Sequence, residues 1–310
     1  MVKTAVELEL GFEIINIISE RMDVSVYKVC RNKQCYLLKI HNKELPFKRE
    51  VEAYTHFPKK GLPVPTLIQS GKISSQYYIV LEWWEGTTLL EAFPQMKPAK
   101  KEEVLYQAGQ LLGTFHFCMT ENEIKETKLW QYAYDGVTSY DDYAWENIFA
   151  KKFPLWIEKI RFKKEDNHKK LIEAFQVTEK EMKHFKFDSP IGIIHRDYGL
   201  RNLMIHDDKI KGIIDFEHTI VGDPVFDLTK LIFNDIDDEH DVHLRESFLD
   251  GWKKQSHMSI PNERLELYIA IQGVSTIQWV DKQPLQDQQQ HQDFRHKGIK
   301  MLFTASELLS

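Results

Sequence analysis

The pattern of hydrophobic and polar residues changes along the chain, from short apolar runs near the N-terminus to helical spacing later. Residues 12–40 hold three short runs rich in isoleucine and valine, separated by polar positions such as those at 31–33. Runs of this length and composition are typical of β-strands joined by hairpins. Two further runs, at 66–70 and 76–83, flank Gly71. The pattern predicts a small antiparallel sheet in the first part of the chain.

Helical spacing dominates after residue 86, and one helix is also expected among the strands. Pro46 can open a helix over 47–57, because Val51, Tyr54 and Phe57 would share one apolar face. Apolar residues recur three or four positions apart over 101–118, 153–162, 165–185, 244–252, 263–280 and 288–309. The sequence therefore predicts an α+β fold, with a small sheet and one helix followed by a larger, mostly helical part.

A second group of short strands is expected inside the helical part, and polar residues follow these strands. The apolar run 191–194 leads into Asp197, and Asn202 follows five residues later. A predicted hairpin over 203–214 then delivers Asp215. Mg²⁺ binds oxygen ligands and often takes only one or two carboxylates when phosphates supply the rest. The pattern predicts phosphoryl transfer, with Asp197 as base and with Asn202 and Asp215 as ligands of Mg²⁺.

A lysine in the third apolar run is a candidate for binding the phosphates of a nucleotide. Lys39 would be unfavourable in a buried strand unless an acid paired with it, and the alternative is a solvent-facing edge. Glu50, at the edge of the apolar face of the helix predicted over 47–57, is the expected partner. Glu52 is the alternative partner on the same helix.

These motifs resemble those of the aminoglycoside phosphotransferase-like family of small-molecule kinases. The resemblance rests on the His-Arg-Asp at 195–197 with Asn202, the Ile-Asp-Phe at 214–216 and the Gly-Asp-Pro-x-x-Asp at 222–227. The chain also lacks the Ala-Pro-Glu segment of protein kinases, as this family does. The resemblance implies a bilobal, protein-kinase-like fold, and the antibiotic phosphotransferases are the most similar in layout.

The same resemblance implies how the chain is divided. Residues 1–86 would form a nucleotide-binding lobe that ends in a hinge at 82–86, and residues 87–310 would form a helical lobe. The helical lobe would contain a catalytic loop at 195–202 and a metal-binding segment at 213–227. In this layout His195, Asp223 and Asp227 are expected to be structural, with Asp227 capping a helix or binding the backbone of the catalytic loop.

The resemblance further implies a site for ATP or GTP with Mg²⁺ between the lobes. Besides the pair of Lys39 and Glu50, Ser25 would contact phosphate, and backbone groups of Glu82 and Trp84 would meet the nucleotide base. The side chain of Trp84 has an alternative role in packing between the lobes. The expected phosphate loop, 19–25, contains no glycine, although glycines normally let a backbone approach phosphates closely.

Two segments are candidates for binding the acceptor of the phosphoryl group. Residues 130–146 combine aromatic residues with carboxylates, and an acidic run contains Asp235, Asp237 and Asp238. Together they would suit a cationic, polyhydroxylated acceptor such as an aminoglycoside. The alternatives are a packed insertion and an ordinary solvated surface. Arg196 is unusual for such kinases, and it could contact an acidic substrate or form a local salt bridge.

Composition narrows the class of protein. The net charge of −6 and the lack of a basic stripe argue against nucleic acid or an anionic membrane as the main partner. No signal peptide or membrane-spanning stretch is expected. Three cysteines form no metal motif, and an odd number suits a reducing cytosol, although Cys30 and Cys35 could face each other across a hairpin and form a disulfide. A cytoplasmic monomer or homodimer is expected.

The sequence leaves the acceptor open. The favoured function is transfer of the γ-phosphate of ATP or GTP to a hydroxyl of a small molecule, including an antibiotic in a resistance enzyme. One alternative is a metabolic kinase of the choline, homoserine or thioribose type. The other is a catalytically silent nucleotide-binding protein of the same fold, which only the glycine-free phosphate loop favours.

Overall fold

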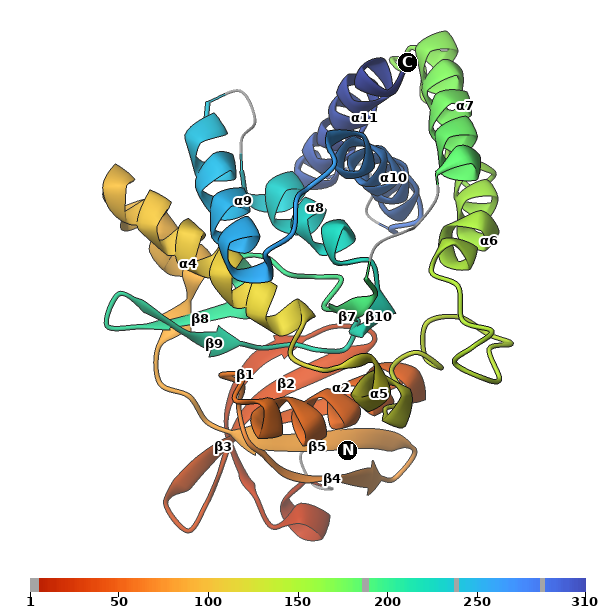
Figure 1. Ribbon diagram of the computed structural model, residues 1–310. Coiled ribbons are helices and arrows are strands. Elements are labelled where there is room, and N and C mark those ends of the chain that lie inside the picture. The colour runs from red at the N-terminus through yellow and green to blue at the C-terminus, as the bar shows by residue number, and fades with distance from the viewer. Residues whose placement is uncertain (1–5, 186–189, 237–239, 285–287) are drawn as a thin grey trace.

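A computed structural model describes residues 6–185, 190–236, 240–284 and 288–310, and shows an α+β fold (Figure 1). The N-terminal part is a five-stranded antiparallel sheet in the order β1-β2-β3-β5-β4. Its strands are β1 (Glu13–Glu20), β2 (Val24–Arg31), β3 (Gln34–His41), β4 (Leu67–Ile73) and β5 (Gln76–Glu82). All five strands were expected from the sequence, and the predicted α+β fold class is confirmed.

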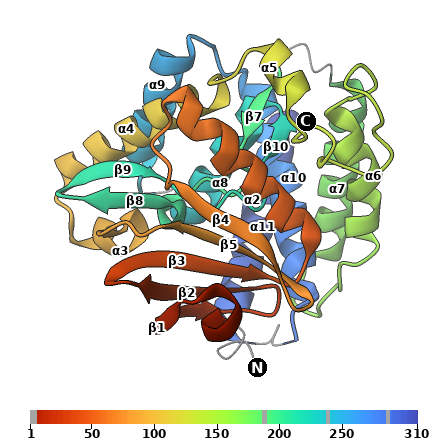
Figure 2. The ribbon, with the colours of Figure 1, turned by 90° about the horizontal axis from the view of Figure 1, so that it is seen from below.

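The helix expected among the strands is α2 (Glu44–His56), which begins three residues before the predicted start at 47. The difference arises because Pro46 occupies the first turn, where a backbone amide needs no partner within the helix. Figure 2, viewed from below, shows α2 lying alongside the sheet. Phe57, just after α2, contacts Phe115 and Phe216 of the C-terminal part at ring-centroid distances of 5.2 and 5.1 Å. A continuous hydrophobic core therefore joins α2 to the helical part.

The C-terminal part is mostly helical, with two small groups of strands near the sheet. Its larger helices are α4 (Pro98–His116), α6 (Glu146–Ile157), α7 (His168–His184), α8 (Pro224–Asp235), α9 (Val242–Ser256), α10 (Asn262–Asp281) and α11 (Gln289–Leu309). Short helices are α3 (Leu89–Ala92) and α5 (Glu121–Glu126). The helix predicted to start at 153 in fact starts at Glu146, because Ile148 and Phe149 are buried together with Phe153 and extend its apolar face.

Short strands hold the segment that carries the expected chemistry. β7 (Gly192–Ile194) pairs with β10 (Ile220–Gly222). β8 (Leu203–His206) lies between β9 (Lys209–Ile213) and the short β6 (Thr87–Thr88). The chain enters β6 through Gly86, which has φ +127°, and a β-carbon there would lie 2.4 Å from the carbonyl oxygen of Ile205. Glycine is needed at this position because both the backbone angle and the close approach exclude a side chain.

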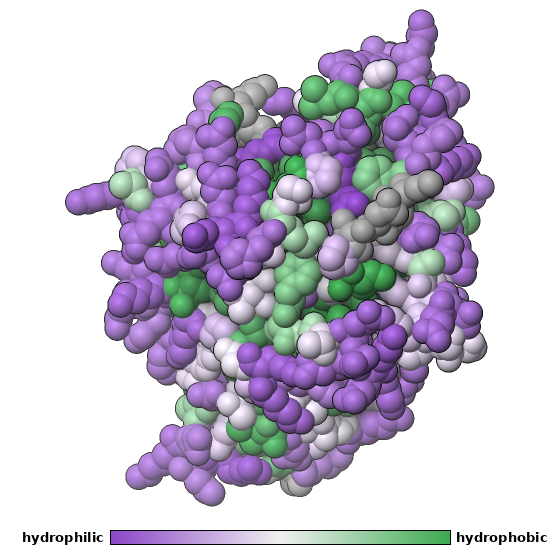
Figure 3. Space-filling view, in the orientation of Figure 1, coloured by the Kyte–Doolittle hydropathy of each residue, from purple (hydrophilic) through white to green (hydrophobic). Residues whose placement is uncertain are grey.

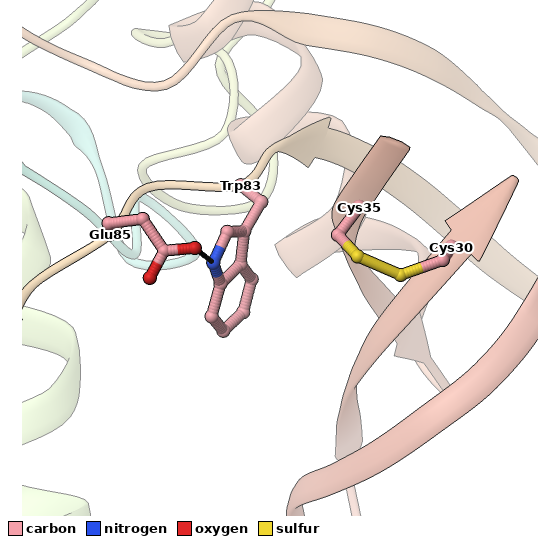
Figure 4. Close-up of a disulfide and its surroundings, with 4 residues drawn as sticks. All are labelled: Cys30, Cys35, Trp83 and Glu85. Atoms are coloured by element: carbon pink, nitrogen blue, oxygen red, sulfur yellow. Dashed lines mark hydrogen bonds between the residues drawn. A yellow bond between two sulfur atoms is a disulfide. The ribbon is translucent and has the colours of Figure 1, made fainter. Parts of the chain in front are cut away.

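Cys30 and Cys35 form a disulfide across the β2–β3 hairpin (Figure 4). The sequence favoured free thiols, and the structure has the disulfide that was kept as the alternative. The tight turn at Asn32 and Lys33, with φ of 54° and 67°, sets the strands so that the two cysteines oppose each other with Cα atoms 4.1 Å apart. Opposed residues at such a short spacing bring their side chains together.

No helix among the described residues is both long and apolar enough to cross a bilayer. In the space-filling view, hydrophilic residues cover most of the visible face and hydrophobic groups gather toward its middle (Figure 3).

Candidate active site

An ion-pair network joins the sheet, α2 and the segment after β9. Lys39 of β3 is buried, and its Nζ lies 2.7 Å from Glu50 Oε1 and 2.9 Å from Asp215 Oδ1. The second oxygen of Glu50 accepts a hydrogen bond from His41 at 2.7 Å. Burial alone would lower the pKa of Lys39, but the charges of Asp215 and Glu50 outweigh burial and raise it well above the ordinary value. Lys39 therefore stays charged, as binding to phosphates requires.

The loop after β7 is held by a single buried carboxylate. Asp227, in the first turn of α8, accepts hydrogen bonds from the backbone amides of His195 and Arg196. It also contacts His116 Nε2 at 3.2 Å. Because Trp252 donates its indole N–H to His116 Nδ1, the proton of that ring lies on Nε2 and points to Asp227. Asp227 therefore binds the backbone of the catalytic loop, which was one of the two roles expected for it.

Arg196 adopts a left-handed backbone conformation, with φ +66°. This conformation is uncommon for a residue other than glycine and persists where the surroundings hold it. The hydrogen bond from its amide to Asp227 Oδ1, at 2.6 Å, supplies part of that support. The turn presents Asp197, the next residue, at the edge of the site.

Asp197 is paired with two residues of its own loop. Arg201 Nη2 lies 2.6 Å from Asp197 Oδ1, and Asn202 donates its amide hydrogens to Asp197 Oδ2 and to the Asp197 carbonyl oxygen. Burial would raise the pKa of Asp197, but the charges of Arg201 and Lys230 lower it below the ordinary value. Asp197 is therefore ionised near neutral pH and can accept a proton.

The predicted metal ligands have the donor atoms that Mg²⁺ prefers. The amide nitrogen of Asn202 is directed to Asp197, so the oxygen of the same amide is the atom left for a cation. Asp215 uses one oxygen for Lys39, and the partly exposed side chain has a second. No cluster of three or more histidine, cysteine, aspartate or glutamate side chains suited to a metal exists in the described part of the chain. This donor set suits Mg²⁺ bound mainly through phosphates.

Glu217 and His218, which follow Asp215 closely in the sequence, have pKa values shifted from the ordinary ones. Burial, with the charge of Asp215, raises the pKa of Glu217 to about 7. Burial, with the charge of Arg196, lowers the pKa of His218 to about 4. His218 Nε2 lies 3.5 Å from Glu217 Oε1, so the two groups face each other beside the ion-pair network.

The other residues predicted to bind nucleotide lie around the same region. Ser25 is on β2, directly opposite Ile40 of β3, and the turn before it has no glycine. The backbone amide of Glu82 donates to the carbonyl oxygen of Thr66 at 2.9 Å, so it is not free for a ligand. The ring of Trp84 packs against β9, because a β-carbon on Gly212 would lie 2.8 Å from it. The packing alternative therefore holds for the Trp84 side chain.

Residues of the two segments predicted to bind a cationic acceptor make contacts within the protein instead. Asp235 accepts a hydrogen bond from the backbone amide of Leu200 at 2.9 Å, so its carboxylate is already bound to the catalytic loop. Asp237 and Asp238 lie outside the described residues. Tyr143 donates to the carbonyl oxygen of Val221, and this and other aromatic residues of 130–146 pack into the core. The packed-insertion alternative accounts for these aromatic side chains.

Several charged residues around the loop at 195–202 were not singled out as site residues from the sequence: Arg49, Lys152, Arg201 and Lys230. Arg201 lies four residues after Asp197 in a short loop, and this spacing could have indicated that the two side chains are in contact. The others come from α2, α6 and α8, and only the fold brings them to the loop. No local signal in the sequence identifies them.

Comparisons with known proteins agree with this geometry. The profile of the phosphotransferase enzyme family matches residues 14–264. A thermostable mutant of aminoglycoside phosphotransferase APH(4)-Ia, in its apo form, has a TM-score of 0.71 and 14% identity over 97% of this chain and 98% of that chain. Spectinomycin phosphotransferase APH(9)-Ia, in complex with ADP and spectinomycin, has a TM-score of 0.65 and 13% identity over 99% and 97%.

A third structure, ADP-bound aminoglycoside phosphotransferase APH(2'')-Ib, has a TM-score of 0.63 and 16% identity over 99% of this chain and 97% of that chain. At these identities the similarities show the fold. No curated protein sequence matches the chain. The family profile covers most of the chain, including the ion-pair network and the catalytic loop. The chain therefore belongs to the phosphotransferase enzyme family and is a small-molecule kinase with a protein-kinase-like fold.

Proposed function

We propose that this protein transfers the γ-phosphate of ATP to a hydroxyl of a small molecule, with Asp197 as the base. The observation that supports the proposal is the contact of Lys39 with both Glu50 and Asp215, next to a loop in which Asp197 and Asn202 are also in contact. An adenine nucleotide is the proposed donor because related structures hold ADP or AMP-PNP.

Each residue has a separate role in this proposal. Lys39 binds phosphate oxygens, and Glu50 and Asp215 keep it charged and in place. Asn202 and Asp215 would hold Mg²⁺, which neutralises charge on the phosphates when bound. Glu82, Trp84 and Ser25 remain proposals for contacts to the base and the phosphates, with Glu82 limited to its carbonyl oxygen because its amide is already bonded to Thr66.

Asp197 would act on the acceptor. The hydroxyl oxygen forms a bond to the γ-phosphorus, the bond from that phosphorus to the β,γ-bridging oxygen breaks, and the hydroxyl proton goes to the Asp197 carboxylate. Arg201 and Asn202 hold that carboxylate in one orientation. Positioning and neutralisation of charge provide most of the rate enhancement in such transfers.

The direct test is nucleotide consumption by the purified protein with hygromycin B, spectinomycin, choline and sugars as acceptors. We expect Asp197→Asn to reduce turnover with any accepted compound by roughly 10²–10⁴-fold, because a general base is lost. The affinity for AMP-PNP should not change, since Asp197 does not contact the Lys39 network. Asp208→Asn is a matched control, because Asp208 is an exposed residue of the β8–β9 turn and asparagine tolerates its φ of +57°.

Undiminished turnover in Asp197→Asn would exclude Asp197 as the base. Failure of the wild-type protein to bind AMP-PNP with Mg²⁺ would contradict the proposed activity as a whole.

A further inference from the structure

His41 and Lys39 lie on the same face of β3, because side chains two positions apart in a strand point to the same side. Glu50 of α2 contacts both of them. Its Oε1 lies 2.7 Å from Lys39 Nζ, and its Oε2 lies 2.7 Å from His41 Nε2. All three side chains are buried. One carboxylate therefore joins two residues of one strand, with one oxygen for each.

The hydrogen on the His41 ring can be placed from these contacts. The ionised carboxylate of Glu50 only accepts hydrogen bonds, so the ring nitrogen that faces it, Nε2, carries a hydrogen and donates it. The other ring nitrogen, Nδ1, is buried, has no hydrogen-bond partner among the described residues and lies 4.0 Å from Glu217 Oε2. In the described part of the chain, the ring is therefore held by its hydrogen bond to Glu50.

Lys39 also contacts a second acid, and this gives the hydrogen bond of His41 a consequence. Asp215 Oδ1 lies 2.9 Å from Lys39 Nζ, and Asp215 is also the proposed ligand of Mg²⁺. With both oxygens bonded, the Glu50 carboxylate cannot rotate without losing a buried hydrogen bond. If Lys39 alone held Glu50, the carboxylate could turn and the ammonium group could shift toward Asp215.

We propose that His41 is a positioning residue for phosphate binding, which fixes the Glu50 carboxylate and thereby holds the Lys39 ammonium group where nucleotide phosphates bind. This inference rests on the proposed function, since it requires Lys39 to contact phosphates. His41 does not touch the nucleotide in this role, because it is buried and its donor is used by Glu50. The other role open to a buried histidine is packing at the end of β3, and the experiment separates the two.

The experiment compares the affinities of AMP-PNP and adenosine for the full-length protein in the presence of Mg²⁺. Adenosine lacks the phosphates that Lys39 would bind, so its affinity reports on the rest of the nucleotide site. We expect His41→Leu to weaken AMP-PNP binding on the order of 10–100-fold, because it leaves an oxygen of a buried carboxylate without its donor. Adenosine binding should change by less than about twofold, because adenosine is independent of Lys39.

Two further variants separate positioning from packing. His41→Gln should restore most of the AMP-PNP affinity, because the amide nitrogen of glutamine can donate to Glu50 in place of Nε2. Ile40→Val is the matched control, since Ile40 is the buried neighbour of His41 on β3 but packs with Leu38 and Val80 in a separate group of core residues. It should lower stability and leave both affinities unchanged. If His41→Leu lowers the unfolding midpoint more than Ile40→Val does, His41→Phe repeats the comparison with a ring that has no donor.

The geometry of the contact has a test of its own, which needs no nucleotide. In ¹⁵N NMR spectra of the wild-type protein, the resonances of His41 can be assigned because they are missing from the spectrum of His41→Gln. We expect a hydrogen on Nε2 of this ring. A ring that carries its hydrogen on Nδ1 alone could not donate to Glu50, and this result would overturn the proposal.

The binding results also distinguish failure of this inference from failure of the proposed function. Unchanged AMP-PNP binding by His41→Leu, an equal loss of adenosine binding, or a His41→Gln variant that binds no better than His41→Leu would overturn the role of His41 alone. A wild-type protein that does not bind AMP-PNP with Mg²⁺ would overturn the proposed function and this inference together. A selective loss of AMP-PNP binding that His41→Gln reverses would support both.

Discussion

The carboxylate of Asp235 lies between the end of α8 and the catalytic loop. It accepts a hydrogen bond from the amide of Leu200, and a β-carbon on Gly199 would lie only 2.7 Å from its oxygen. Burial raises the pKa of Asp235 to about 6. The hydrogen bond organises the loop, but the charge on the same side chain opposes folding at neutral pH.

Asp235→Asn should therefore stabilise the protein at pH 8, by up to about 2 kcal/mol, because the amide oxygen can still accept from Leu200 and the buried charge is gone. The pKa of Asp235 is raised in the folded state. The stability that this side chain contributes is therefore fully present below about pH 4, where it is protonated in both states, and is lost as the pH rises through about 6. Urea unfolding from pH 8 downward should show the advantage of the variant shrinking. A variant that is less stable at pH 8 would contradict this account.

Some residue roles could be predicted from the sequence, and others could not. Lys39 and Glu50 were paired correctly because they lie on consecutive elements whose patterns were clear. Asp227 was expected to be structural, and the structure shows the second of its two expected roles, a contact with the backbone of the catalytic loop. Asp235 was expected to face a substrate, and its bond to Leu200 depends on how α8 crosses the loop, which no local pattern reveals.

The disulfide of the β2–β3 hairpin lies near the segment 82–86 proposed as the hinge, because Tyr36 of β3 pairs with Glu82. Figure 4 shows the ring of Trp83 between Glu85 and the disulfide. Trp83 donates its indole N–H to Glu85 at 2.7 Å, and Lys28 of β2 lies 4.2 Å from the ring centroid. Disulfides persist more often in oxidising compartments, and the cytoplasmic location stays a prediction.

Reduction of the Cys30–Cys35 disulfide should lower the free energy of unfolding by roughly 2 kcal/mol, because the bond closes a short loop in the unfolded chain. Urea unfolding with and without dithiothreitol measures the difference. The double variant Cys30→Ser and Cys35→Ser should unfold at the same midpoint in both conditions, since Cys118 is free in either case. A wild-type protein insensitive to reductant would indicate that the thiols are already free in solution.

The elements themselves could largely be predicted, because strands and helices leave a regular pattern of apolar residues. Their ends were less predictable. α6 starts at Glu146 rather than 153, since the residues that extend its apolar face lie in a stretch whose aromatic content suggested a binding loop. The pairing of β6 with β8 joins residues far apart in sequence and had no local signal.

At the scale of the whole molecule, α4 and α9 pack through glycines and support the catalytic loop. A β-carbon on Gly109 would lie 2.0 Å from the carbonyl oxygen of Phe248, and one on Gly251 would lie 2.0 Å from that of Tyr106. Tyr198 of the catalytic loop donates its hydroxyl to the carbonyl oxygen of Ala108 at 2.8 Å. The distance between α4 and α9 therefore affects the position of the catalytic loop.

Gly109→Ala should destabilise the protein by about 1–3 kcal/mol and lower kcat, because the added methyl group meets the backbone of α9 and α9 must move. Urea unfolding and turnover with an accepted compound measure the two effects. Thr114→Ala, an exposed position on the same helix, should change stability by no more than about 0.5 kcal/mol. Equal effects of the two substitutions would show that the close approach of the helices tolerates a side chain.

The division of the chain at residue 86 stays a prediction, but the junction between the sheet and the helical part has a clear arrangement. The backbone amide of Ile213 donates to the carbonyl oxygen of Pro63 at 3.0 Å, and Thr87 and Thr88 pair with β8. Two separate segments, one at Pro63 and one at Thr87–Thr88, therefore attach to the β8–β9 hairpin. α2, in contrast, shares the core of the helical part.

Lys39 and Glu50 belong to different elements at this junction. Lys39 is on the third strand of the sheet, and Glu50 is on α2, which Phe57 joins to Phe115 and Phe216. Their 2.7 Å contact therefore depends on how the sheet packs against α2, so we expect nucleotide phosphates that bind Lys39 to favour the same packing.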